Sequence, residues 1–175
     1  MICQFNALVI IDTEKIIAAY LEPVQDVKNP PVIIDPSFAF ILCPSATSNI
    51  STEQIDLYLN ADGGDNLSFR CTSFFGNSNN SVFFYDDYIE NNNQIFGKFI
   101  LNINTLSRAI QPDPKQQDGL PPIHVCATFS NIESKVLRKG SEQVDLMFSL
   151  YQLDDDGQSQ SLYGYFGLKL QLTVS

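Results

Sequence analysis

Apolar and polar residues alternate with a period of two along most of the chain, which is the pattern of half-buried β-strands. Alternation is strictest in Gln143–Leu153 and in Leu162–Val174, where apolar residues or glycine occupy every second position. Other strands are expected at Phe5–Asp12, Val32–Ile34, Phe38–Cys43, Gln54–Leu59, Leu67–Cys71, Val82–Tyr85 and Ile123–Phe129. The segment Phe99–Ile110 is ambiguous and fits a strand followed by a loop. The pattern predicts an all-β fold, an antiparallel β-sandwich of jelly-roll or immunoglobulin-like type.

Helix is expected only at Thr13–Tyr20, with Asp12 or Thr13 as its cap and Pro23 limiting its length. Residues 111–122 contain four prolines and predict a long surface loop, because proline cannot continue a strand ladder. The strands after this loop would make a poor domain alone. We therefore expect one domain over residues 1–175.

Composition and charge indicate which binding partners and which cellular compartment to expect. The chain has 175 residues, of which 44% are hydrophobic, and a net charge of -10 without a local basic patch. Duplex nucleic acid and anionic membranes would be repelled, so neither is an expected partner. No basic residue precedes Lys15, so the N-terminus does not read as a signal peptide, and we expect a cytoplasmic protein. The four cysteines are expected to be free and buried.

No catalytic set or cofactor motif is recognisable. The single histidine, His124, lies in a predicted strand, and we interpret it as structural and expect neither an enzyme nor a metal or other cofactor. Asp154-Asp-Asp-Gly157 could suggest a calcium loop, but position 163, where an EF-hand needs glutamate, is Tyr163. Asp-Gly between two strands is typical of a hairpin turn, which is the preferred interpretation.

One cluster is a candidate for binding a polar ligand. Tyr85, Asp86, Asp87 and Tyr88 place two rings and two carboxylates at the end of a predicted strand, and Asp35 is a weaker candidate. Sugar sites combine a stacking ring with a few polar groups that fix orientation. A solvated strand end explains the same residues and is the simpler interpretation.

A succession of short motifs runs along almost the whole chain: Val9-Ile-Ile-Asp-Thr-Glu14, Asn29-Pro30, Gly64-Asp65, Phe69-Arg-Cys-Thr-Ser73, Ser81-Val-Phe-Phe-Tyr85, Pro112-Asp-Pro114 and Leu162-Tyr-Gly-Tyr-Phe166. In this order the motifs resemble the AidA/PixA family of bacterial inclusion body proteins. The chain departs from the family in having Cys71 and Leu168-Lys-Leu170 where members often carry tryptophan, and in having only two methionines. A storage role through sulfur-rich composition therefore does not follow.

The resemblance implies a β-sandwich produced abundantly in the cytoplasm, sometimes in inclusion bodies, and associated with host interaction. Our first hypothesis is a non-enzymatic module that binds a carbohydrate or similar polar ligand, by fold-level analogy. The alternative is a self-assembling inclusion or storage protein without a small ligand. Either hypothesis is compatible with a homodimer or higher oligomer, because a sandwich presents strand edges.

Overall fold

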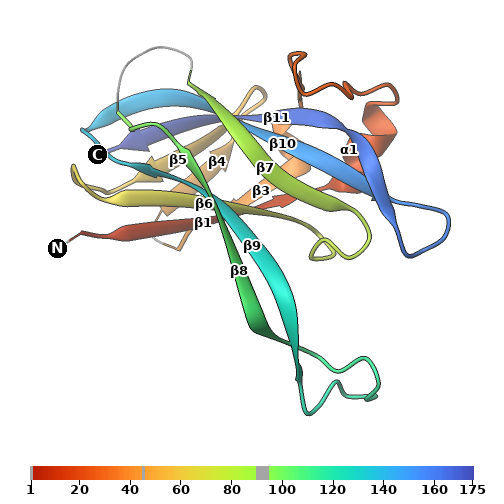
Figure 1. The fold of residues 1–175 in the computed structure, drawn as a ribbon. Helices are drawn as coiled ribbons and strands as arrows, with labels where there is room; N and C mark the ends of the chain where they lie inside the picture. Colours follow the sequence, from red (N-terminus) through yellow and green to blue (C-terminus); the bar gives the residue numbers. More distant parts are fainter. Residues whose placement is uncertain (1, 45, 90–94) are drawn as a thin grey trace.

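The computed structural model describes residues 2–44, 46–89 and 95–175, with the backbone alone at residues 87–89. Its strands form two sheets that enclose a common core (Figure 1). The five-stranded sheet has the order β3 (Ala39–Leu42), β1 (Gln4–Ile11), β6 (Asn66–Ser73), β9 (Ile123–Lys135) and β8 (Ile100–Gln111). The six-stranded sheet has the order β4 (Ala46–Ile50), β5 (Ile55–Leu59), β11 (Gln160–Val174), β10 (Gly140–Leu153) and β7 (Ser81–Ile89), and β2 (Val32–Ile33) also pairs with β11.

The all-β sandwich predicted from the alternation is confirmed, but its sheets are mixed rather than purely antiparallel. β1 pairs with β6 in parallel, and β11 pairs in parallel with both β5 and β2. Parallel neighbours need a crossover rather than a hairpin. Between β1 and β6 the chain crosses to the other sheet to form β4 and β5, and that crossover gives β6 the direction of β1. Strand β4, rich in serine and threonine, was missed by the sequence pattern.

The core is built mainly by the long β10–β11 hairpin. The predicted apolar faces are confirmed: Val144, Leu146, Phe148 and Leu150 on β10, and Phe166, Leu168, Leu170 and Leu172 on β11, all have 0% exposure. The rings of Phe148 and Phe166 stack with centroids 5.8 Å apart. Asp145 and Ser149, expected on the polar face, are buried as well, at 8% and 6% exposure. The second face of β10 is therefore buried at these two positions and partly buried at Gln143, Met147 and Tyr151.

The predicted helix is α1 (Thr13–Ala19), and the cap is Asp12 rather than Thr13. The carboxylate of Asp12 accepts a hydrogen bond from the backbone N–H of Lys15 at 3.1 Å, which satisfies one of the free donors of the first turn. At the other end, the hydroxyl of Tyr163 donates to the carbonyls of Ile17 and Tyr20 at 3.2 and 2.7 Å. Tyr163 thus fastens the helix to β11. No helix among the described residues is long and apolar enough to cross a membrane.

The ambiguous segment before the proline-rich loop is a full strand, β8, which forms a long hairpin with β9. β9 pairs with β6 only at Ile132–Lys135, so the remainder of the hairpin projects away from the sandwich (Figure 1). We call its residues 103–130 the arm. The predicted proline-rich loop forms its tip, because β8 ends at Gln111 and β9 begins at Ile123.

The prediction that all four cysteines are buried is wrong for two of them. All four are free thiols, but Cys3 and Cys126 are exposed, while Cys43 and Cys71 are partly buried. Cys126 lies in the arm, which lacks the second sheet that covers the body strands. Apolar neighbours in the sequence, such as Val125, do not bury a thiol when the strand itself stands in solvent.

Candidate functional site

Two of the predicted ligand residues, Tyr85 and Asp86, lie on β7 at the surface. Tyr85 is half-buried, and its ring meets the ring of Tyr165 edge-on, with centroids 5.3 Å apart. Burial raises the pKa of Tyr85, and the charge of Asp86 and the neighbouring Tyr165 add to the increase. The phenol therefore stays protonated at neutral pH and can donate a hydrogen bond. The side chains of Asp87 and Tyr88 lie outside the described residues.

A hollow of about 340 Å³ adjoins these two residues. Its described lining consists of Tyr85, Asp86, Lys98, Phe99, Ile100, Leu101 and Ile132. The ring of Tyr85, the carboxylate of Asp86 and the ammonium group of Lys98 lie beside apolar side chains. Such a combination can orient a small polar ligand. The sequence did not predict that Lys98 and Phe99 line this hollow, because they lie just before β8 and belong to no recognisable motif.

Asp35 does not belong to this hollow and has a structural contact instead. It caps the short 3₁₀ helix η1 (Pro36–Phe38), and its carboxylate accepts the backbone N–H of Ser37 at 2.8 Å. Hydrogen bonds from the side chain and the backbone of Ser37 lower the pKa of Asp35. The structure therefore separates Asp35 from Tyr85 and Asp86, with which the sequence analysis grouped it.

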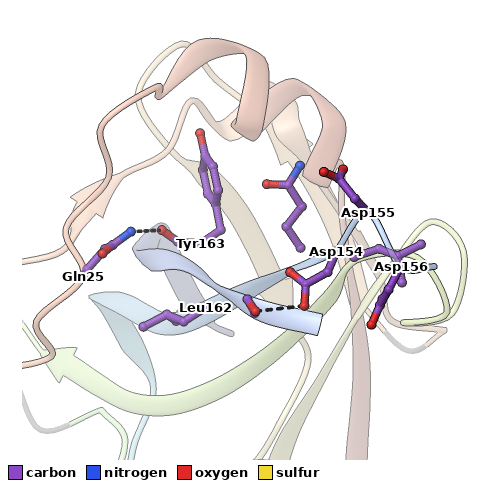
Figure 2. Close-up of a pocket in the computed structure, with 9 residues that line it drawn as sticks. Gln25, Asp154, Asp155, Asp156, Leu162 and Tyr163 are labelled. Carbon is purple, nitrogen blue, oxygen red and sulfur yellow. Dashed lines mark hydrogen bonds between the residues drawn. The ribbon is translucent and has the colours of Figure 1, made fainter. Parts of the chain in front are cut away.

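A larger hollow, of about 540 Å³, lies beside the turn between β10 and β11 (Figure 2). Its lining residues are Gln25, Gln152, Leu153, Asp154, Asp155, Asp156, Ser161, Leu162 and Tyr163. The three carboxylates point in different directions and do not converge on one point (Figure 2). The amide of Gln25 donates to the carbonyl of Tyr163 at 3.5 Å, closing one side of the hollow.

The acidic triplet is a hairpin turn, as predicted. Gly157 has φ +66°, and its N–H donates to the carbonyl of Asp154 at 3.0 Å. Asp156 accepts the backbone N–H groups of Gln158 and Ser159, both at 2.8 Å, and these bonds lower its pKa. Hydrogen bonding to the ionised form is the cause of that decrease. No group of three potential metal ligands occurs among the described residues.

A third hollow, of about 530 Å³, opens on the solvent-facing side of the five-stranded sheet. It is lined by Asn6, Ala7, Leu8, Leu42, Pro44, Ser68 and Arg70. Sequence reasoning missed this site because Leu8 belongs to a continuous apolar run, which does not show which residues face outward. Leu42 lies directly opposite Leu8 on the neighbouring strand, a pairing that only the sheet register shows.

His124, the residue required by most nucleophilic schemes, is exposed in the arm. Its Nδ1 lies 3.3 Å from the carbonyl oxygen of Arg108, a contact within the arm itself. It does not line any of the three hollows.

The fold is a β-sandwich with three surface hollows, whose described linings combine polar and apolar side chains. The family model of PixA, described as an inclusion body protein, matches residues 3–174. The chain therefore belongs to the PixA inclusion body protein family. The crystal structure of the PixA inclusion body protein from Burkholderia cenocepacia is similar to it, with a TM-score of 0.80 and 25% sequence identity. The match covers 99% of this chain and 97% of that chain. No curated protein matches the sequence.

Proposed function

We propose that this chain is a non-enzymatic protein that functions by associating with itself, and that it packs into dense bodies in the cytoplasm. The observation that carries the proposal is the arm. A two-stranded ribbon is marginally stable in water without a packing partner. This one exposes Ile103 at 64%, Leu106 at 53% and Ile110 at 59%. The family's description as inclusion body proteins supports the same function.

The test is to express the full chain in a bacterial host and examine the cells for dense bodies, then measure the mass of the purified protein over a wide range of concentration. We expect visible bodies and a mass that rises with concentration. A chain that stays dispersed in cells, and monomeric at every concentration, would overturn the proposal. Circular dichroism of protein dissolved from the bodies distinguishes packed native sheet from misfolded aggregate.

A second candidate function is binding of a polar ligand, such as a carbohydrate on a host surface, at the hollow beside Tyr85. The specific support is the combination of Tyr85, Asp86 and Lys98 around about 340 Å³. A glycan array with the purified chain, run with calcium and with EDTA, tests it. Saturable binding that is lost in Tyr85→Ala and Asp86→Ala would support this site, and unchanged binding in both variants would remove it.

A further inference from the structure

The five-stranded sheet has an outer face that no helix of the described structure covers. Residues paired across neighbouring strands share a face, and successive residues alternate between faces. Phe69 and Ile132, which pair with each other, are in the core, so their neighbours Ser68 and Glu133 lie on the outer face. Following the register across the sheet gives this face as Gln4, Asn6, Leu8, Ile10, Phe40, Leu42, Asn66, Ser68, Arg70, Thr72, Ile100, Asn102, Asn104, Leu106, Ala109, Gln111, Ile123, Val125, Ala127, Phe129, Asn131, Glu133 and Lys135. We call it the outer face.

The outer face is unusually apolar for a surface in contact with water. Antiparallel sheets with one solvated face normally place polar residues there. Here the exposed side chains include Leu8 at 37%, Phe40 at 40%, Leu42 at 57%, Ile100 at 60%, Leu106 at 53% and Phe129 at 42%. The ring of Phe40 also contacts that of Phe74, itself 54% exposed, with centroids 5.7 Å apart. The exposed apolar residues form two patches, one on β1 and β3 and one on the β8–β9 hairpin, and the polar outward residues of β6 lie between them. Exposed apolar patches with polar borders mark interaction sites.

Charge is distributed very unevenly between the two sheets. The chain has 20 acidic residues, but the five strands of this sheet contain only Glu133, together with the cations Arg70, Arg108 and Lys135. The strands of the six-stranded sheet contain one cation, Lys169, and the five carboxylates Asp56, Asp86, Asp87, Glu142 and Asp145. Two copies of a chain with net charge -10 repel each other over most of their surfaces. The five-stranded sheet, with three cations and one carboxylate on its strands, does not add to that repulsion.

We propose that a second copy of this chain covers the outer face, in a two-fold symmetric dimer in which the arm of each copy lies on the sheet of the other. The inference rests on the proposed self-association and specifies its surface. In a two-fold interface the same patch meets itself, so the patch must be self-complementary. Arg70 and Glu133 satisfy this requirement, because the cation of one copy can meet the carboxylate of the other.

The available area is sufficient for a stable dimer. Strands lie about 4.8 Å apart and rise about 3.4 Å per residue. The body part of the face has four residues of β3, eight each of β1 and β6 and about four each of β9 and β8, so it measures about 460 Å². The arm adds about 300 Å² for nine residues on two strands. A specific interface buries about 800 Å² on each partner. The two parts together measure about 760 Å², which is close to the standard size, and neither part approaches it alone.

Other occupants fit the face less well. An anionic lipid surface is recognised by clusters of four to eight basic residues, whereas the strands of this sheet carry three cations and one carboxylate. The opposite side of the arm is a poorer interface, because its apolar residues Ile103 and Ile110 are separated by Thr105 on the same strand and face Ser130, Thr128 and His124 on β9. The outer side instead presents Leu106, Phe129 and Val125 together.

The first experiment measures the mass of the full chain by sedimentation velocity across concentration, for the natural sequence and for Leu42→Asp and Phe129→Asp. Leu42 lies on the body part of the outer face and Phe129 at the base of the arm, and both are already exposed, so the variants should fold. We expect a dimer, and a dissociation constant raised at least tenfold in each variant. The matched control is Leu21→Asp, at a residue that is 79% exposed and outside the face, and it should dimerise normally. A natural chain that is monomeric throughout, or a dimer unaffected by both variants, would overturn the interface.

A charge exchange tests the symmetry itself. Arg70→Glu and Glu133→Arg each place like charges opposite one another across the two-fold axis and should weaken the dimer at least tenfold. Combining both substitutions restores opposite charges and should recover most of the affinity. Failure of the double variant to recover affinity would contradict the contact.

Two further outcomes separate this inference from the proposed function. Dense bodies that persist in cells expressing Phe129→Asp would overturn the interface and leave self-association standing. A dimer that depends on Phe129 in a protein that never forms bodies would keep the interface and overturn the proposed function. Sedimentation of a monomeric chain with phosphatidylcholine or phosphatidylglycerol vesicles would assign the face to lipid and overturn the second copy.

Discussion

The two long hairpins of this molecule have similar lengths and opposite surroundings. β10 and β11 run for 14 and 15 residues in the middle of the six-stranded sheet, with β7 on one side and β5 and β2 on the other. β8 and β9 run for 12 and 13 residues, but β9 has a second neighbour only over its last four residues. The sequence of each hairpin is enough to form its two paired strands. Whether its side chains are buried depends on which other strands lie beside the hairpin. The difference shows that strand formation and core formation are separate consequences of the sequence.

The largest expected difference between the hairpins concerns removal of a phenylalanine ring. Phe148 on β10 has 0% exposure, whereas Phe129 on β9 is 42% exposed. Phe148→Ala should lower the free energy of unfolding by about 3–5 kcal/mol, because it leaves a cavity in packed surroundings. Phe129→Ala should cost no more than about 1 kcal/mol at concentrations where the chain is monomeric. Urea denaturation measures both, and equal losses would show that the arm packs on its own body.

The sequence predicted the buried hairpin better than the projecting one. In β10 the alternation is strict from Val144 to Leu150, because a strand between two neighbours needs one wholly apolar face. In β8 the alternation is diluted by asparagine at 102 and 104 and interrupted by a bulge after Leu106, so the pattern left strand and loop undecided. The alternation also could not predict that β1 and β6 pair in parallel, because the two strands are joined by a long crossover that includes β2 to β5.

The candidate site was predicted only in part. Tyr85 and Asp86 line the same hollow although successive residues of a strand normally face opposite ways. The pairing of β7 with β10 shifts register at Tyr85, which is the extra residue of a β-bulge. Asp35 and Lys98 could not be assigned correctly, because which loops meet a strand depends on the sheet order. The apolar outer face was missed for a related reason: Leu8 and Leu42 are 34 positions apart and become neighbours only in the β1–β3 register.

The body of the sandwich and the arm should also differ in the reactivity of their thiols. Burial raises the pKa of Cys71 to about 12, and its thiol donates to the carbonyl of Val82 at 3.4 Å. Only the thiolate attacks disulfide reagents, so at pH 8 we expect Cys71 to react far more slowly than the exposed Cys126 of the arm. Labelling followed by mass spectrometry measures the rates.

The same labelling reports which side of the arm a second copy covers. Cys126 lies on the side of the arm opposite Phe129, since odd-numbered and even-numbered residues of β9 face opposite ways. Its reaction rate should therefore stay the same as the protein concentration rises. Protection of Cys126 at high concentration would place the partner on the wrong side for the proposed interface.

A smaller effect is expected from adding one methyl group at the end of the buried hairpin. A Cβ atom at Gly164 would lie 2.5 Å from the Cβ of Pro23 and 3.1 Å from the carbonyl oxygen of Val24. Gly164→Ala should therefore cost about 1–3 kcal/mol through overpacking. The control is Gly97→Ala, where the nearest atom is 3.7 Å away, and its change should stay within about 0.5 kcal/mol. Equal melting temperatures for the two variants would contradict the close approach of Pro23 to β11.

The smallest effect concerns one carboxylate of the body, and it depends on pH. Asp65 accepts the backbone N–H groups of Cys3 and Asp62 at 2.8 and 3.0 Å, and these bonds lower its pKa below the usual value. A carboxyl whose pKa is lower in the folded state contributes its stabilisation fully above the unfolded pKa of about 3.9 and loses it as the pH falls through the folded value. Asp65→Asn should therefore lower the melting temperature modestly at pH 7 and flatten its decline below about pH 4.

The matched control is Asp118→Asn at the tip of the arm, where the carboxylate accepts only the N–H of Leu120 at 3.0 Å. This variant should leave the melting curve nearly unchanged. A natural chain and an Asp65→Asn variant with parallel acid profiles would show that those two hydrogen bonds do not favour the ionised form.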